Sequence, residues 1–118
     1  MKLQVKFSNR FKSDLKLAKK QNKNLDKLFL VIEKLANLEK LDDKYRDHSL
    51  VGEYKGLREC HIEPDWLLIY YVENNTLTLV LADTYDFNKN EKDDSALLSA
   101  SVKAMTNGDL VPYYSLVT

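Results

Sequence analysis

The side chains best suited to acid–base chemistry are gathered in one stretch, residues 47–71. It holds both histidines of the chain, its single tryptophan and its single cysteine. An imidazole exchanges protons near neutral pH and can act as base or acid, and a neighbouring carboxylate can orient it or accept a proton. If this protein has a catalytic site, we therefore expect it in this stretch. Taken alone, a histidine that alternates along a strand is more often structural, so the prediction depends on the surrounding pattern.

The same stretch contains residues suited to binding RNA. Lys55 and Arg58 could neutralise charge that develops on a phosphorus atom, and Trp66 could stack on a base. Two alternatives stay open: Arg58 and Asp65 could form only an ion pair across a turn, and Trp66 could fill the core.

The N-terminal end of the chain is basic although the formal net charge of the protein is zero. Residues 2–23 contain one acidic residue, Asp14, among seven lysines and one arginine. Local potential rather than net charge attracts a phosphate backbone. We predict contacts with nucleic-acid phosphates from four lysines of this end: Lys12, Lys16, Lys19 and Lys20. The alternative is a merely solvated helix face.

Composition restricts the class of protein. A chain of 118 residues with 44% hydrophobic residues is expected to form one globular domain. Cys60 is the single cysteine, so no internal disulfide is possible, and a packed thiol is expected rather than a nucleophile. Two histidines and one cysteine provide no spaced ligand set for a metal, so no metal or cofactor is predicted. Without a signal-peptide pattern or an apolar run of ~18 residues, a cytoplasmic protein that does not enter the membrane is expected.

The elements that must position these residues follow from hydrophobic periodicity. Period-two alternation predicts a first strand over residues 2–7, and apolar residues at helical spacing predict helices over 9–20 and 25–38, capped by Ser8 and Asn24. Residues 39–46 read as a structured loop, and Gly52 and Gly56 indicate a turn. The expected fold class is α+β, with an N-terminal strand, a helical hairpin and then an antiparallel meander over residues 57–62, 66–72 and 76–82.

Residues 47–71 resemble the YafQ branch of the RelE/ParE toxin superfamily. The matching letters are D-H-S-L at 47–50, Gly52, Y-K-G at 54–56, R-E-C-H-I at 58–62, P-D-W at 64–66 and L-I-Y at 68–70. The first strand and the basic helix are also similar, so the likeness covers residues 1–84. A match at so many irregularly spaced polar and glycine positions is far more specific than a match to a short motif.

The resemblance implies a RelE-like toxin of a type II toxin–antitoxin pair, a ribosome-dependent endoribonuclease that cuts mRNA without a metal. A base would remove a 2′-OH proton, the 2′ oxygen would attack phosphorus, and an acid would protonate the departing 5′ oxygen. His48, His61 and Asp65 match the family's active-site histidines and aspartate, and Trp66 matches a nearby aromatic residue. The implied partners are a cognate antitoxin, the ribosome with mRNA in its A site, and operator DNA through the antitoxin only.

The sequence leaves the family pattern after Thr84. The family's closing Gly-Ser-His segment is missing, and the chain continues with Tyr85. We therefore divide it into a toxin domain at residues 1–85 and a divergent tail at 86–118, in which 96–105 could form a short helix and 110–118 an extended segment. Tyr85 could replace the missing histidine as a catalytic residue, a frameshift could have replaced the native end, or the protein could be a weakened toxin.

Two other functions remain open from the sequence. The first is a catalytically weakened or inactive module that keeps the toxin fold and binds an antitoxin for autorepression. The second is a gyrase-poisoning relative on the ParE side of the superfamily, which would have no need of this set of histidines and aspartate.

Overall fold

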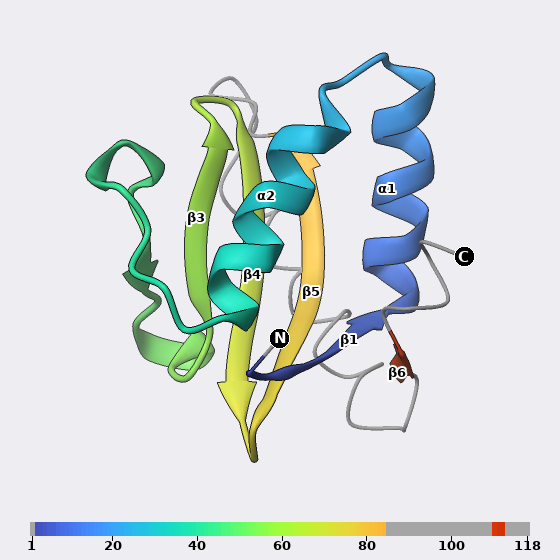
Figure 1. Ribbon diagram of the computed structural model, residues 1–118. Helices are drawn as coiled ribbons and strands as arrows, with labels where there is room; N and C mark the ends of the chain where they lie inside the picture. Colours follow the sequence, from blue (N-terminus) through green and yellow to red (C-terminus); the bar gives the residue numbers. More distant parts are fainter. Residues whose placement is uncertain (1, 85–109, 113–118) are drawn as a thin grey trace.

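The computed structural model describes residues 2–84 and 110–112, which form two helices packed on a sheet (Figure 1). In chain order, the elements are β1 (Gln4–Ser8), α1 (Asn9–Lys20), α2 (Leu25–Ala36), the 3-10 turn η1 (Asp43–Tyr45), β2 (His48–Ser49), the 3-10 turn η2 (Gly52–Tyr54), β3 (Arg58–Glu63), β4 (Trp66–Glu73), β5 (Thr76–Thr84) and β6 (Leu110–Pro112). The expected α+β fold is confirmed. The predicted helix at 96–105 lies outside the described residues.

The sheet has the strand order β2-β3-β4-β5-β1-β6. From β2 to β5, each strand pairs antiparallel with the next strand in the chain, which confirms the predicted meander. The first strand joins this meander by pairing parallel with β5, and β6 pairs antiparallel with β1. The parallel pair is possible because the helical hairpin carries the chain back across the sheet before the meander begins.

Both helices begin at the predicted caps. Ser8 Oγ accepts the backbone N–H of Phe11 at 3.1 Å, and Asn24 Oδ1 accepts that of Asp26 at 3.1 Å. The second helix ends at Ala36, two residues before the predicted end, because Leu38 adopts a left-handed backbone with φ of 60°. The Glu39 N–H then bonds the Lys34 carbonyl at 2.9 Å, closing the helix end as in a Schellman motif.

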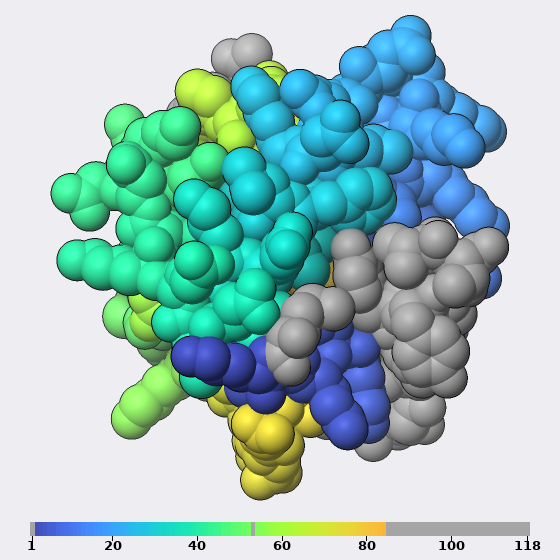
Figure 2. Space-filling model, in the orientation of Figure 1, coloured from blue at the N-terminus to red at the C-terminus, as the bar shows by residue number. Residues whose placement is uncertain are grey.

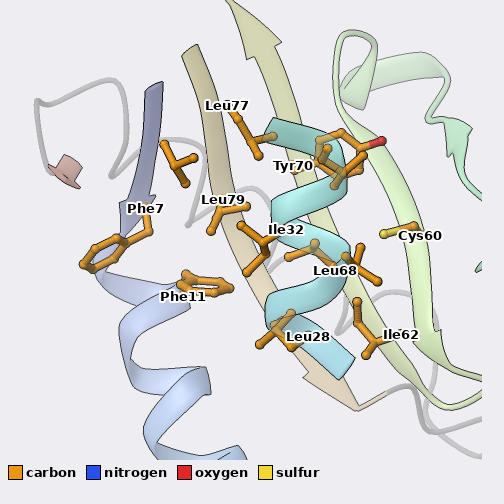
Figure 3. Close-up of a cluster of buried hydrophobic side chains, with 14 of the residues drawn as sticks. Phe7, Phe11, Leu28, Ile32, Cys60, Ile62, Leu68, Tyr70, Leu77 and Leu79 are labelled. Carbon is orange, nitrogen blue, oxygen red and sulfur yellow. The ribbon is translucent and has the colours of Figure 1, made fainter. Parts of the chain in front are cut away.

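The main core lies between the helices and one face of the sheet, which we call the helix face. Figure 2 shows α2 and the chain that follows it covering this face, and Figure 3 shows Leu28 and Ile32 of α2 among side chains from four strands. A smaller cluster of Leu57, Ile69, Val80 and Leu81 lies on the opposite side, which we call the second face. No described helix is long and apolar enough to cross a membrane.

Candidate active site

Two histidines and a glutamate meet on the second face of the sheet. Antiparallel pairing of β2 with β3 sets His48 directly opposite Glu59, and Glu59 and His61 point to the same side because they are two residues apart on one strand. The Nε2 atoms of His48 and His61 each lie 3.6 Å from Oε1 of Glu59. One carboxylate oxygen thus stands between two imidazoles.

The outer nitrogen of each imidazole contacts a backbone carbonyl oxygen. His48 Nδ1 lies 2.6 Å from the carbonyl oxygen of Arg46, and His61 Nδ1 lies 3.1 Å from that of Pro64. A carbonyl oxygen only accepts hydrogen bonds, so in a neutral ring Nδ1 carries the proton and Nε2 keeps its lone pair. Both basic nitrogens are therefore presented toward Glu59.

The three side chains differ in exposure. The side chain of His48 is 51% exposed, whereas those of Glu59 and His61 are 21% and 16% exposed. The carboxylate can pair with whichever imidazole carries a proton, so the cluster can hold one proton while keeping a second imidazole free to accept another. This is the chemistry that acid–base catalysis requires.

Glu59 was not among the predicted catalytic residues. The signal for it was present, because the alternation of residues 57–62 already placed Glu59 and His61 on one face of a strand. What the sequence lacked was the register that sets His48 opposite Glu59, which depends on how η2 and Gly56, with φ of 101°, reverse the chain.

A hydrogen-bond network on the helix face holds β2 against β3 and β4. Arg58 donates to Asp47 at 3.2 Å, to Ser49 Oγ at 2.7 Å and to the Tyr70 hydroxyl at 3.3 Å. The Tyr70 hydroxyl in turn donates to Asp47 at 2.5 Å. These hydrogen bonds, the one to Asp47 above all, raise the pKa of the Arg58 guanidinium, and burial followed by the bond to Asp47 raises the pKa of the Tyr70 hydroxyl.

The network changes the interpretation of Arg58. Arg58 points to the opposite side of the sheet from Glu59 and His61, because it is one residue from Glu59 on the same strand. The alternative of an ion pair with Asp65 is wrong, because the ionic partner of Arg58 is Asp47. The expectation that Arg58 neutralises charge at a reacting phosphate stays a prediction. Its role in this fold is to fix the residue that precedes His48.

Trp66 is also placed away from the cluster. It is 1% exposed and belongs to the main core, with Nζ of Lys23 5.3 Å from its ring centroid. A ring this deeply buried offers no free face to a base. The expectation of base stacking is wrong, and the core alternative is correct.

The remaining predicted residues are exposed and are not gathered at the histidines. Asp65 lies in the two-residue turn between β3 and β4, directly after Pro64, whose carbonyl oxygen His61 contacts. Lys55 lies before β3, at the other end of that strand. Four lysines are exposed on α1, which packs on the helix face: Lys12, Lys16, Lys19 and Lys20. Tyr85 lies outside the described residues.

The described residues offer neither an exposed thiol nor a ready metal site. Cys60 is fully buried, and burial is the main cause that raises the pKa of its thiol, so it is a packed side chain as predicted. Within residues 2–84 and 110–112, no group of three or more His, Cys, Asp or Glu side chains is arranged to hold a metal ion.

The family model for YafQ, a bacterial toxin of type II toxin–antitoxin systems, matches residues 3–87. The chain belongs to the YafQ toxin family. This confirms the resemblance found in residues 47–71. The mRNA interferase toxin YafQ of Escherichia coli K12 is 37% identical over 82 residues, which are 69% of this chain and 89% of that YafQ.

Solved structures of YafQ-like toxins share the fold. The toxin in the E. coli DinJ–YafQ toxin–antitoxin complex is 35% identical with a TM-score of 0.65, over 71% of this chain and 93% of that one. A copper-bound mutant toxin from Helicobacter pylori is 33% identical with a TM-score of 0.68, over 70% of this chain and 93% of that one. The YafQ likeness thus covers the two helices and the meander that carry the candidate site.

Proposed function

We propose that this toxin is a ribosome-dependent endoribonuclease that cuts mRNA by acid–base catalysis without a metal. The observation that carries the proposal is the placement of His48 and His61 on either side of the Glu59 carboxylate. The name mRNA interferase, which the E. coli relative bears, supports the substrate.

In the proposed reaction, Nε2 of His61, the less exposed imidazole, takes the proton from a ribose 2′-OH with Glu59 beside it. The 2′ oxygen then forms a bond to the adjacent phosphorus, and the bond from phosphorus to the 5′ oxygen breaks. His48, protonated on Nε2, gives its proton to that departing oxygen. The products are a 2′,3′-cyclic phosphate and a free 5′-hydroxyl, so protons and bonds balance.

Three predicted residues keep subsidiary roles in this proposal. Asp65, in the turn that supplies the carbonyl contact of His61, helps to fix that imidazole. Lys55 is an exposed cation for the RNA backbone. Tyr85 is the alternative to His48 as proton donor for the 5′ oxygen.

The proposed partners are a cognate antitoxin, the ribosome carrying mRNA in its A site, and operator DNA through the antitoxin, all in the cytoplasm. The complex of the related E. coli toxin with DinJ supports the first of these.

Mutation of the two histidines tests the proposal directly. Purified toxin added to translating ribosomes should cut mRNA, and the double variant His48→Ala, His61→Ala should not. Lys2→Ala, an exposed change far from both histidines, is the control. Full cleavage by the double variant would rule out the assigned mechanism, and cleavage of free RNA at the same rate would rule out ribosome dependence.

A second candidate function is a weakened toxin that serves to bind its antitoxin. The observation that favours it is the end of the family match at residue 87 in a chain of 118 residues. Unimpaired translation together with tight antitoxin binding would support this alternative.

A further inference from the structure

A cavity of about 360 Å³ lies beside the cluster of His48, Glu59 and His61, and His61 is one of its lining residues. Its other lining residues come from the start of α2, from η1 and from the end of β3: Lys27, Lys44, Tyr45, Ile62, Glu63 and Pro64. This volume is within the range of small-ligand sites, about 300–1,000 Å³. Figure 1 shows the chain after α2 passing to the side of β3, where β2 also lies.

Beside this cavity, the edge of β3 is contacted by η1 but has no strand partner among the described residues. The short strand β2 pairs only with Arg58 and Glu59, so the later residues of β3 have no strand partner on that side among the described residues. A chain bound at His48, Glu59 and His61 on the second face can therefore pass around this edge into the cavity, because His61 belongs to both.

Two lysines, Lys27 and Lys44, and one carboxylate, Glu63, line the cavity. Within the described residues, Lys44 forms no ion pair with a carboxylate, and its Nζ lies 5.2 Å from the ring centroid of Tyr45. Lys27 is 3.8 Å from Glu63, with its own side chain 55% exposed. Exposed ion pairs and cation–π contacts of this kind are weak, so both ammonium groups can turn to a phosphate.

A neighbouring cavity of about 280 Å³ offers a useful contrast. Its lining contains three cationic side chains and four carboxylates: Lys40, Arg46, Arg58, Glu39, Asp42, Asp43 and Asp47. Arg58 and Asp47 are already paired with each other. A cavity in which acids outnumber bases repels a polyanion, so of these two cavities the one beside His61 suits RNA better.

We propose that the cavity formed by Lys27, Lys44, Tyr45 and Pro64 is a subsite for the nucleotide of mRNA next to the cleaved bond. Lys44 and Lys27 bind its phosphate, and its base packs against Tyr45 and Pro64. The inference rests on the proposed function for its substrate class. It adds a binding site that reads the nucleotide beside the reacting one.

Titration with a 2′-O-methyl RNA trinucleotide tests the subsite, because this probe lacks the 2′-OH nucleophile and stays intact. In amide NMR spectra of the whole protein, the expected shifts include residues 44–46 and 61–63 as well as His48 and Glu59. Lys44→Glu should weaken binding by about tenfold or more, since an attractive charge is replaced by a repulsive one. Tyr45→Phe should bind as the wild type does, whereas Tyr45→Leu should bind more weakly.

Lys2→Glu is the matched control, because it reverses an exposed charge at the opposite end of α2 and should leave binding unchanged. Shifts confined to His48 and Glu59, or an unchanged affinity of Lys44→Glu, would overturn the subsite. Equal shifts with inorganic phosphate alone would also overturn it, because they would indicate a simple anion site.

Cleavage of mRNA on ribosomes separates this inference from the proposed function. Lys44→Glu should raise KM and leave kcat nearly unchanged, whereas loss of kcat alone would contradict a binding role. If the wild-type protein cuts no mRNA, the proposed function fails, and the trinucleotide titration still decides whether the cavity binds a nucleotide.

Discussion

At the scale of single residues, the proposed chemistry depends on the carboxylate of Glu59. Within the described structure, this carboxylate alone lies at ion-pair distance from both imidazoles. Glu59→Gln keeps the size and hydrogen-bonding capacity of the side chain but removes its charge. We expect kcat for mRNA cleavage to fall by about 10²-fold, the lower end of the usual contribution of an acid–base group.

The measurement for Glu59→Gln is single-turnover cleavage on ribosomes, with circular dichroism to show that the variant folds. Glu73→Gln changes an exposed carboxylate at the end of β4 and serves as the control. An unchanged kcat in Glu59→Gln would remove Glu59 from the mechanism.

Tyr70 tests whether the network around Asp47 stabilises the fold. Tyr70→Phe deletes the hydroxyl that donates to Asp47 and accepts from Arg58. Since Asp47 keeps Arg58 as a partner, we expect the free energy of unfolding to fall by about 1–2 kcal/mol. Urea denaturation measures this, and an Asp47→Asn, Tyr70→Phe double variant should lose less than the sum of the single losses. Additive losses would show that the two side chains are not coupled.

At the scale of elements, a buried carboxylate joins α1 to the end of β5. Asp14 accepts the Ala82 N–H at 3.1 Å and pairs with Arg10 at 2.8 Å, and Arg10 also reaches Asp83 at 2.7 Å. Burial raises the pKa of Asp14 from 3.8 to about 6, although Arg10 and the Ala82 N–H oppose the shift. The end of β5, from which Tyr85 follows, is therefore tied to the basic helix.

This raised pKa predicts how stability depends on pH. Between about pH 4 and 6 the folded state binds more protons at Asp14 than the unfolded state does. The stability that protonated Asp14 contributes is therefore complete below pH 4 and is lost as pH rises through 6. Two pKa units correspond to at most about 3 kcal/mol. Asp14→Asn cannot ionise and keeps an acceptor for Ala82.

Urea unfolding at a series of pH values measures the difference between wild type and Asp14→Asn. The free energy of unfolding of Asp14→Asn minus that of the wild type should increase from pH 4 to 6 and then stay constant. Asp26→Asn, at an exposed position in the first turn of α2, should show no such growth. A constant difference across the range would contradict the raised pKa of Asp14.

The elements could be predicted from the sequence more fully than the site. Periodicity and the caps Ser8 and Asn24 set the helix starts, because those signals are local. The parallel position of β1 beside β5 and the pairing of His48 with Glu59 depend on contacts between distant residues, so no local pattern contains them. The burial of Trp66 and the pairing of Arg58 with Asp47 were missed for the same reason, because both depend on contacts with residues distant in the sequence.

At the scale of the whole molecule, the two halves of the predicted RNA surface lie on opposite sides of the sheet. His48, Glu59 and His61 are on the second face, and α1 with its exposed lysines packs on the helix face. In the proposed mechanism, the lysines of α1 are therefore too far from the histidines to act on the cleaved bond, and any RNA that they bind is a different segment.

This separation predicts that charge reversal on α1 changes affinity without changing chemistry. In the variant Lys12→Glu, Lys16→Glu, KM for cleavage on ribosomes should rise and kcat should stay the same. The dependence of log affinity on log salt should also become shallower by roughly 0.7–0.9 for each phosphate that the variant no longer neutralises. Measuring KM over a series of salt concentrations, with Lys2→Glu as a single charge reversal away from α1, checks both. An unaltered KM and salt slope would show that these lysines form only a solvated helix face. The cations around the β3 edge would then be the expected ribosome-binding surface.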